Sequence, residues 1–122
     1  MRLASLMMTA ALLTGCYSLD DVRSQPVVWT ATYPAAFDSI ANCLAGRYAG
    51  EYSVVPQLYQ NERRANVILS NTSGGAVLAE FQVRQLDGSS SEVSWRHMGS
   101  PAGGNRSVDR DARANADRCG KA

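Results

Sequence analysis

The sequence has one lysine, Lys121, and one histidine, His97, among its 122 residues. Its 12 basic and 11 acidic side chains nearly cancel, and no run of basic residues stands out. Nucleic-acid-binding proteins and proteins recruited to anionic lipid usually carry basic clusters. No apolar run approaches the about 20 residues that a membrane-spanning helix needs. The sequence therefore gives no indication of a nucleic-acid partner or of a permanent transmembrane span.

The first 15 residues have the pattern of an export signal. Arg2 supplies a positive charge, the 11 residues from Leu3 to Leu13 form a short apolar run, and Thr14 and Gly15 are small. A charged start, a short apolar stretch and small residues before a cleavage point are typical of secretory signal peptides. We therefore expect residues 1–15 to be removed.

The end of this signal predicts how the chain is anchored. Leu13-Thr14-Gly15-Cys16 resembles the lipobox of bacterial lipoproteins. The resemblance implies a diacylglyceryl group on the Cys16 thiol, cleavage before Cys16 and acylation of the new amino group. Several acyl chains hold a protein stably on a membrane, whereas one chain does not. The alternative is an ordinary secretory signal that happens to contain a cysteine.

The residue after Cys16 indicates which membrane is involved. In enterobacterial lipoproteins an aspartate at this position retains the protein in the inner membrane, and here the residue is Tyr17. The resemblance therefore favours the outer membrane. Residues 17–26 are polar and lack a periodic pattern, which predicts a tether. We expect a lipidated cysteine and tether over 16–26 and one small domain over 27–122, without net charge once Arg2 is removed.

Cys43 and Cys119 remain once Cys16 is assigned to lipid. An even pair in an exported protein predicts a disulfide. The bridge would close a loop of about 75 residues, which contributes roughly 4 kcal/mol in the chain-entropy model. Two free thiols or a metal-binding pair are the alternatives, although one distant histidine completes no recognised zinc spacing.

Hydrophobic periodicity predicts two helices. Apolar residues recur at three- and four-residue intervals over 34–47, and Pro34 suits a first helical position. A second helix is expected from Ser107, with Cys119 on its apolar stripe and Gly120 at its end. Both cysteines of the predicted bridge then lie on or beside the core faces of two helices.

Strands are expected at 26–33, at 51–60 and in three further segments before residue 99. Pro56 in the second strand argues for a sheet edge, and Asp87-Gly88 indicates a hairpin turn. Odd-numbered positions of the last three strands carry the large apolar side chains, Phe81 and Trp95 among them, and even-numbered positions are mostly polar. We therefore predict an α+β two-layer sandwich: an antiparallel meander of four or five strands, two helices on one face, and water on the other.

His97 is the obvious candidate for acid–base or metal chemistry. Glu92, Asp109 and Asp111 could assist it, but no spacing predicts that these side chains converge. A histidine at a strand end, satisfied by solvent, is the favoured interpretation. The sequence predicts no catalytic residue, no cofactor and no metal site. Trp95 shares the phase of the core, whereas Trp29 could be either exposed or buried.

These features predict a non-enzymatic domain held on the envelope by lipid on Cys16. We expect this neutral domain, with one polar sheet face, to bind another macromolecule: an envelope protein, peptidoglycan, or a host or phage factor. An inhibitor or accessory subunit of an envelope enzyme, presenting the 99–105 loop or the 86–90 turn, is the first alternative. A small hydrolase is the second. An exposed patch would favour a binding protein and a concave pocket with converging polar groups an enzyme. The sequence does not indicate an oligomeric state.

Overall fold

The computed structural model describes residues 17–99 and 106–121. The expected lipidation site Cys16 and nearly all of the 99–105 loop lie outside this range. The described elements, in chain order, are α1 (Leu19–Arg23), β1 (Trp29–Tyr33), α2 (Phe37–Tyr48), β2 (Ser53–Tyr59), a 3₁₀ turn (Gln60–Glu62), β3 (Arg64–Ser70), β4 (Val77–Gln85), β5 (Ser91–His97) and α3 (Arg106–Lys121).

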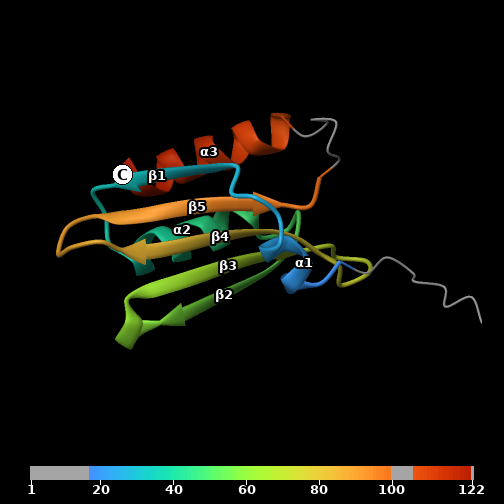
Figure 1. Ribbon diagram of the computed structural model, residues 1–122, viewed down its shortest axis with the longest axis horizontal. Helices are drawn as coiled ribbons and strands as arrows, with labels where there is room; N and C mark the ends of the chain where they lie inside the picture. Colours follow the sequence, from blue (N-terminus) through green and yellow to red (C-terminus); the bar gives the residue numbers. More distant parts are fainter. Residues whose placement is uncertain (1–16, 100–105, 122) are drawn as a thin grey trace, which may run out of the picture.

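The strands form one antiparallel sheet in the order β1-β5-β4-β3-β2. Successive strands β2 to β5 make the predicted meander, and β1 joins it at the far edge beside β5 (Figure 1). Helices α2 and α3 lie on one face of the sheet, and α1 lies on the other (Figure 1). The α+β sandwich of sheet and helices is confirmed, and of the four or five strands expected the sheet has five.

The core lies between the sheet and the helices α2 and α3. Phe81 is completely buried at its centre, with ring centroids of Trp95, Tyr48 and Trp29 at 4.5, 5.7 and 6.3 Å. The odd-numbered positions of β3, β4 and β5 face this core, as the alternation predicted. Trp29 also packs against it from β1, so it is not an exposed contact residue.

Helices α2 and α3 are joined covalently. The Sγ atoms of Cys43 and Cys119, the pair predicted to form a disulfide, lie 2.04 Å apart, with 5.6 Å between the Cα atoms. One turn further along, Arg47 Nε donates to Asn115 Oδ1 at 2.6 Å, and Asn115 Nδ2 donates to the Tyr48 hydroxyl at 3.1 Å. The bridge and these hydrogen bonds fix the two helices against each other above the core.

The second sheet face corrects two expectations. Residues 19–23, within the segment expected to be a tether, form α1, which packs on β4 and β5. Val22 is completely buried there, and Ile68 and Glu80, two even-numbered positions expected in water, are 6% and 1% exposed. This face is therefore only partly in water, and the folded domain begins well before residue 27.

Two helix boundaries also differ from prediction. Helix α2 begins at Phe37 rather than Pro34, because Gln85 Oε1 accepts a hydrogen bond from the Phe37 backbone N–H at 3.0 Å and replaces a local cap. Gly120 lies inside α3 instead of ending it. A Cβ atom at Gly120 would overlap the Tyr33 side chain, so glycine is required for close packing of α3 on β1.

Candidate functional site

A row of uncharged polar side chains crosses all five strands on the second sheet face, with four of them at least partly exposed and Asn66, on β3, 5% exposed. In the pairing register Gln57 on β2 lies opposite Asn66 on β3, Asn66 opposite Gln82 on β4, Gln82 opposite Ser94 on β5, and Ser94 opposite Thr30 on β1. Facing residues in an antiparallel pair project from the same side of the sheet. We call these five residues the polar row. Because strands are about 4.8 Å apart, the row is roughly 19 Å long.

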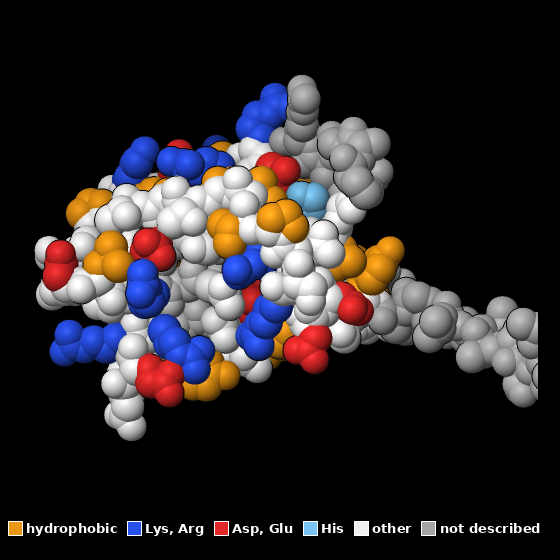
Figure 2. Space-filling view, viewed as in Figure 1, with side chains coloured by type: hydrophobic (Ala, Val, Ile, Leu, Met, Phe, Trp, Pro, Cys, Tyr) orange, Lys and Arg blue, Asp and Glu red, His pale blue; other side chains and the backbone are white. Residues whose placement is uncertain are grey.

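Arginine side chains flank the polar row on both sides. Arg64 and Arg84 come from the neighbouring positions of β3 and β4 toward the 3₁₀ turn, and Arg96 comes from β5 on the side of α1, together with Arg23 of α1 itself. Figure 2 shows this face, with blue arginine side chains on either side of a shallow depression in the middle of the sheet. Two strand positions thus place arginines toward one side of the row, and β5 and α1 each place one arginine toward the other.

The depression itself has a volume of about 220 Å³. Its lining is mostly hydrogen-bonding or charged: Arg64, Asn66, Gln82, Val83, Arg84, Glu92 and Ser94. The one apolar member, Val83, is 1% exposed and belongs to the core. The depression therefore offers amide, hydroxyl and guanidinium groups, carried on aliphatic stems that make up much of its exposed wall.

Three of the four arginines have carboxylate partners. Arg23 Nε and Nη2 donate to the two oxygens of Glu80 at 3.1 and 2.8 Å, Arg64 pairs with Glu62, and Arg84 Nη2 donates to Glu92 Oε1 at 3.2 Å. The Arg84–Glu92 pair is a surface pair, and such pairs contribute about 0–1 kcal/mol. It can therefore exchange for a pair with an incoming anion at little cost.

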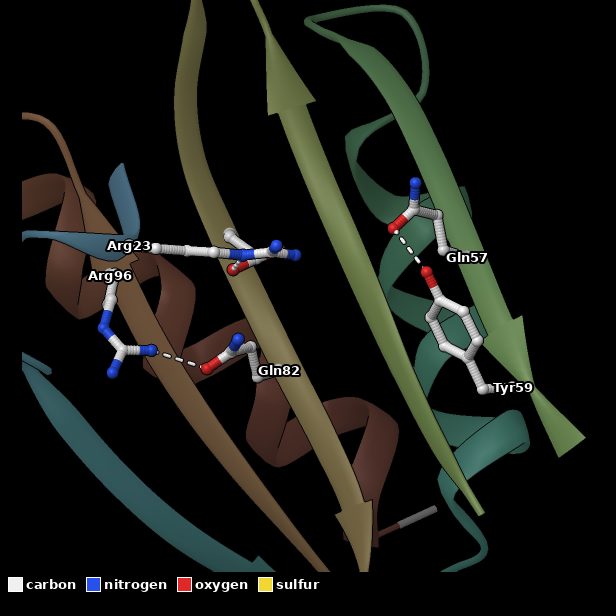
Figure 3. A network of polar contacts seen from close by, with 6 residues as sticks. Arg23, Gln57, Tyr59, Gln82 and Arg96 are labelled. Atoms are coloured by element: carbon white, nitrogen blue, oxygen red, sulfur yellow. Dashed lines mark hydrogen bonds and ion pairs between the residues drawn. The ribbon is translucent and has the colours of Figure 1, made fainter. Parts of the chain in front are cut away.

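Arg96 has a different environment. Its Nε donates to the Gln25 carbonyl at 3.1 Å, and its Nη1 donates to Gln82 Oε1 at 2.5 Å. No carboxylate in the described part of the chain forms an ion pair with it. Figure 3 shows the Arg96 guanidinium directed at Gln82 of the polar row, with Gln57 and Tyr59 paired on β2. Arg96 thus presents a half-buried positive charge, held in place by neutral groups, at the edge of the row.

A second hollow lies between α2, α3 and the ends of β3, β4 and β5, with a volume of about 560 Å³. Trp95, Leu69 and Leu78 contribute apolar lining, and Arg47 and Asp111 contribute charged groups of both signs. A concave pocket with converging polar groups is what an enzyme would be expected to show, so this cleft would be the place for an enzyme site. The described lining includes no serine, threonine or cysteine that could serve as a nucleophile.

His97 lines this cleft, and its position corrects the sequence interpretation. It is not satisfied by solvent: its side chain is 12% exposed, Nε2 lies 2.8 Å from Asp109 Oδ1, and Nδ1 lies 3.0 Å from the Met98 carbonyl oxygen. Trp95 Nε1 donates to the same Asp109 oxygen at 2.9 Å. Both ring nitrogens thus face oxygen atoms of the protein, Nε2 the Asp109 carboxylate and Nδ1 the Met98 carbonyl. The contacts of His97 and Trp95 with Asp109 link β5 to α3.

The other candidate residues do not converge on His97. Glu92 pairs with Arg84 on the opposite sheet face, and Asp111 lines the cleft while the imidazole pairs with Asp109 instead. Across residues 17–99 and 106–121, no group of three or more His, Cys, Asp or Glu side chains could hold a metal ion. None of the described helices is long and apolar enough to span a bilayer.

The sequence had indicated the polar face as a whole but not the polar row. The row needs the strand register, which brings together residues from five strands, and only the alternation within each strand is visible beforehand. Comparison with protein-family models finds no match for this chain, and comparison with curated proteins finds no relative. The surface chemistry described above is therefore the basis for a functional proposal.

Proposed function

We propose that this chain is a lipid-anchored, non-enzymatic protein of the bacterial envelope, located at the outer membrane rather than the inner one. We further propose that it binds another envelope macromolecule through the second face of its sheet. The observation that carries the proposal is the polar row of hydrogen-bonding side chains with arginines on both sides. A surface of this kind supports binding, because it is lined by groups that each need a polar partner when water is removed.

The beginning of the domain is compatible with a short anchor. The Tyr17 carbonyl accepts a hydrogen bond from the Val77 backbone N–H at 2.9 Å, and Ser18 caps α1 through a reciprocal bond with Asp21. Because Tyr17, the residue that follows Cys16, is itself hydrogen-bonded to the sheet, lipid on Cys16 would hold the domain against the membrane surface. This supports a partner located within the envelope close to that membrane.

Cysteine substitution tests the anchor. In cells, Cys16→Ser is expected to block lipidation and signal cleavage, because the thiol is the acceptor of the diacylglyceryl group. Cys43→Ser is the matched control, since it also replaces a cysteine, the one bridged to Cys119, and leaves the lipobox intact. Processing is read from the apparent mass, and anchoring from membrane fractionation. A Cys16→Ser protein that matures to the same size and stays with the membrane would disprove the anchor.

Photo-crosslinking in living cells tests the binding face. A photoreactive residue at Thr30, the exposed end of the polar row, should give a defined crosslinked product with an envelope component. The same residue at Ser39, exposed on α2 in the other layer, is the control. Equal products from both positions, or none from Thr30, would contradict binding through this face.

The turn between β4 and β5 favours a second candidate function, as an inhibitor or accessory subunit. Asp87 Oδ1 accepts hydrogen bonds from the backbone N–H groups of Ser89 and Ser90, both at 2.8 Å, and these bonds lower the pKa of the Asp87 carboxyl. Leu86, 45% exposed, stands on this ordered turn. A rigid turn that displays an apolar side chain can dock into a pocket of a target protein. Crosslinking from Leu86 but not from Thr30 would favour this candidate.

A further inference from the structure

We propose that the macromolecule bound by the polar row is peptidoglycan, with a glycan strand lying along the row and the carboxylates of its stem peptides held by Arg84 and Arg96. This inference rests on the proposed function and names the chemistry of its partner. It follows from three properties of the surface: the kind of groups in the row, the arginines beside it, and the absence of an aromatic side chain from the described lining of the depression.

The groups of the row match a ligand rich in hydroxyl and acetamido groups. Amide side chains both donate and accept, and so do hydroxyl groups. Gln57, Gln82 and Ser94 are half-buried, and the Thr30 and Ser94 hydroxyl oxygens lie 3.3 Å apart at the β1 end. A row roughly 19 Å long can face several consecutive sugar rings. A straight, repeating ligand suits it better than a compact one.

The arginines supply the charge complementarity. Peptidoglycan carries carboxylates at regular intervals along its strands. Arg96 has no carboxylate partner among the described residues, and Arg84 is engaged only in a surface pair with Glu92. Guanidinium groups bind carboxylates through paired N–H donors, which gives hydrogen bonds about twice as strong as neutral ones. Both arginines adjoin the row, so sugar contacts and carboxylate contacts can form together.

The depression lacks the features of a protein-binding centre. Protein interfaces usually depend on a few aromatic or apolar anchors seated in well-packed pockets. No aromatic side chain among the described residues lines the depression, and Tyr59 on β2, 37% exposed, lies beneath the Arg64 guanidinium, which is 4.1 Å from its ring centre. The surface therefore favours a polar polymer over a protein partner, and a protein partner becomes one outcome of the test.

Co-sedimentation with purified peptidoglycan sacculi tests the inference. The full chain, isolated from a bacterial envelope in detergent, is expected to sediment with sacculi, and added salt should weaken the association because exposed charges are screened. Arg84→Gln and Arg96→Gln should each lower the affinity about tenfold, the change that corresponds to about 1.4 kcal/mol. Arg110→Gln, which removes one charge from the exposed surface of α3, is the matched control and should bind as the unmodified chain does.

Arg96 is half-buried, so its variant is first checked for folding by circular dichroism. Arg84 is exposed, and its variant keeps the test decisive if Arg96→Gln fails to fold. Sacculi whose carboxylates have been capped as amides should bind at least several-fold more weakly than untreated sacculi. Unchanged affinity for capped sacculi, or equal affinity of the Arg84 and Arg110 variants, would overturn the inference.

The result also separates this inference from the function on which it rests. If the chain does not co-sediment with sacculi but crosslinking from Thr30 captures a protein, the polar row binds a protein and the peptidoglycan inference is wrong. If the chain does not bind sacculi and crosslinking from Thr30 captures no envelope component, the proposed function is wrong as well.

Discussion

The guanidinium of Arg23 and the carboxylate of Glu80, 57 residues apart in sequence, form a two-bonded ion pair that fastens α1 to the centre of the sheet. The Glu80 side chain is fully buried, whereas that of Arg23 is 37% exposed. The hydrogen bond to Glu80, opposed by partial burial, raises the pKa of Arg23 above its ordinary value. Arg23 thus neutralises an acid that would otherwise be buried without a partner.

Arg23→Ala is expected to destabilise the protein by about 2–3 kcal/mol. Removing one partner of a buried pair costs about 3–5 kcal/mol, and the partial exposure of Arg23 reduces that figure. Replacing both residues, as Arg23→Met with Glu80→Met, should cost less than Arg23→Ala, because no buried charge is left alone. Urea denaturation measures the differences. A double variant less stable than the single one would show that the pair itself provides the stability.

Phe81→Ala should cost about 3–5 kcal/mol, as expected for a fully buried phenylalanine. Its ring contacts three other aromatic rings at the centre of the core. Arg84→Ala, on the same strand but on the other face, should cost no more than about 1 kcal/mol. Gln82, although even-numbered, is not a free surface residue, because its Oε1 accepts from Arg96. Thermal unfolding that ranked Phe81 and Arg84 equally would contradict the assigned faces.

Loss of the Cys43–Cys119 bridge should lower the stability by about 2–5 kcal/mol. The paired hydrogen bonds of Arg47 and Asn115 remain and keep α2 and α3 together in part. Mass spectrometry of the unreduced protein after alkylation should find neither cysteine modified. Two alkylated thiols in the native protein would show that no bridge forms, and Cys43→Ser should then unfold at the same midpoint as the unmodified chain.

Tyr33 and Asp117 should make stability depend on pH at both extremes. Burial, reinforced by the 2.7 Å hydrogen bond to Asp117, raises the pKa of Tyr33 from 10.0 to about 12. The unfolded chain then loses the proton first, so stability falls as pH rises from about 10 to about 12, by roughly 2–3 kcal/mol at 1.36 kcal/mol per unit. The same hydrogen bond lowers the pKa of Asp117 below its ordinary 3.8. Its contribution is present above that ordinary value and is lost as pH falls through the lowered one.

Tyr33→Phe should flatten both changes relative to the unmodified chain, when urea unfolding is followed from pH 3 to pH 12. Tyr59→Phe, at an exposed tyrosine, leaves the Tyr33–Asp117 pair intact and is the control. If the two variants had the same pH profile, the hydrogen bond would not be the cause.

His97→Ala is expected to lower stability by about 1–3 kcal/mol, since it leaves Asp109 and the Met98 carbonyl without their contacts to the imidazole. Binding to the partner should survive, because His97 belongs to the helix-covered layer and the polar row lies on the other face. The measurement is co-sedimentation or crosslinking of the folded variant. Loss of binding in a folded protein would move the functional site to the cleft.

The sequence predicted most of the sheet because apolar and polar side chains alternate, with a period of two residues, along a strand that is buried on one face. It could not predict α1 from periodicity: five residues contain only Leu19 and Val22 as apolar positions, and their anchor is Glu80, far along the chain. One local signal was present, since Ser18 and Asp21 have the spacing of a capping box. The environment of His97 could not be predicted from the sequence either, because its partner Asp109 comes from a different element, α3.

The pairing of β1 with β5 has a kinetic consequence. Thr30 and Ser94 are neighbours in the sheet although 64 residues separate them in sequence, whereas β2 to β5 pair with strands that follow directly. Contacts between distant residues form slowly, because the loop must close before they stabilise anything. In a chain exported from its N-terminus, as proposed, β1 emerges first and finds its partner last. In the same way, Cys43 can form its disulfide only after Cys119 has been exported. The domain therefore completes its folding only once α3 has emerged.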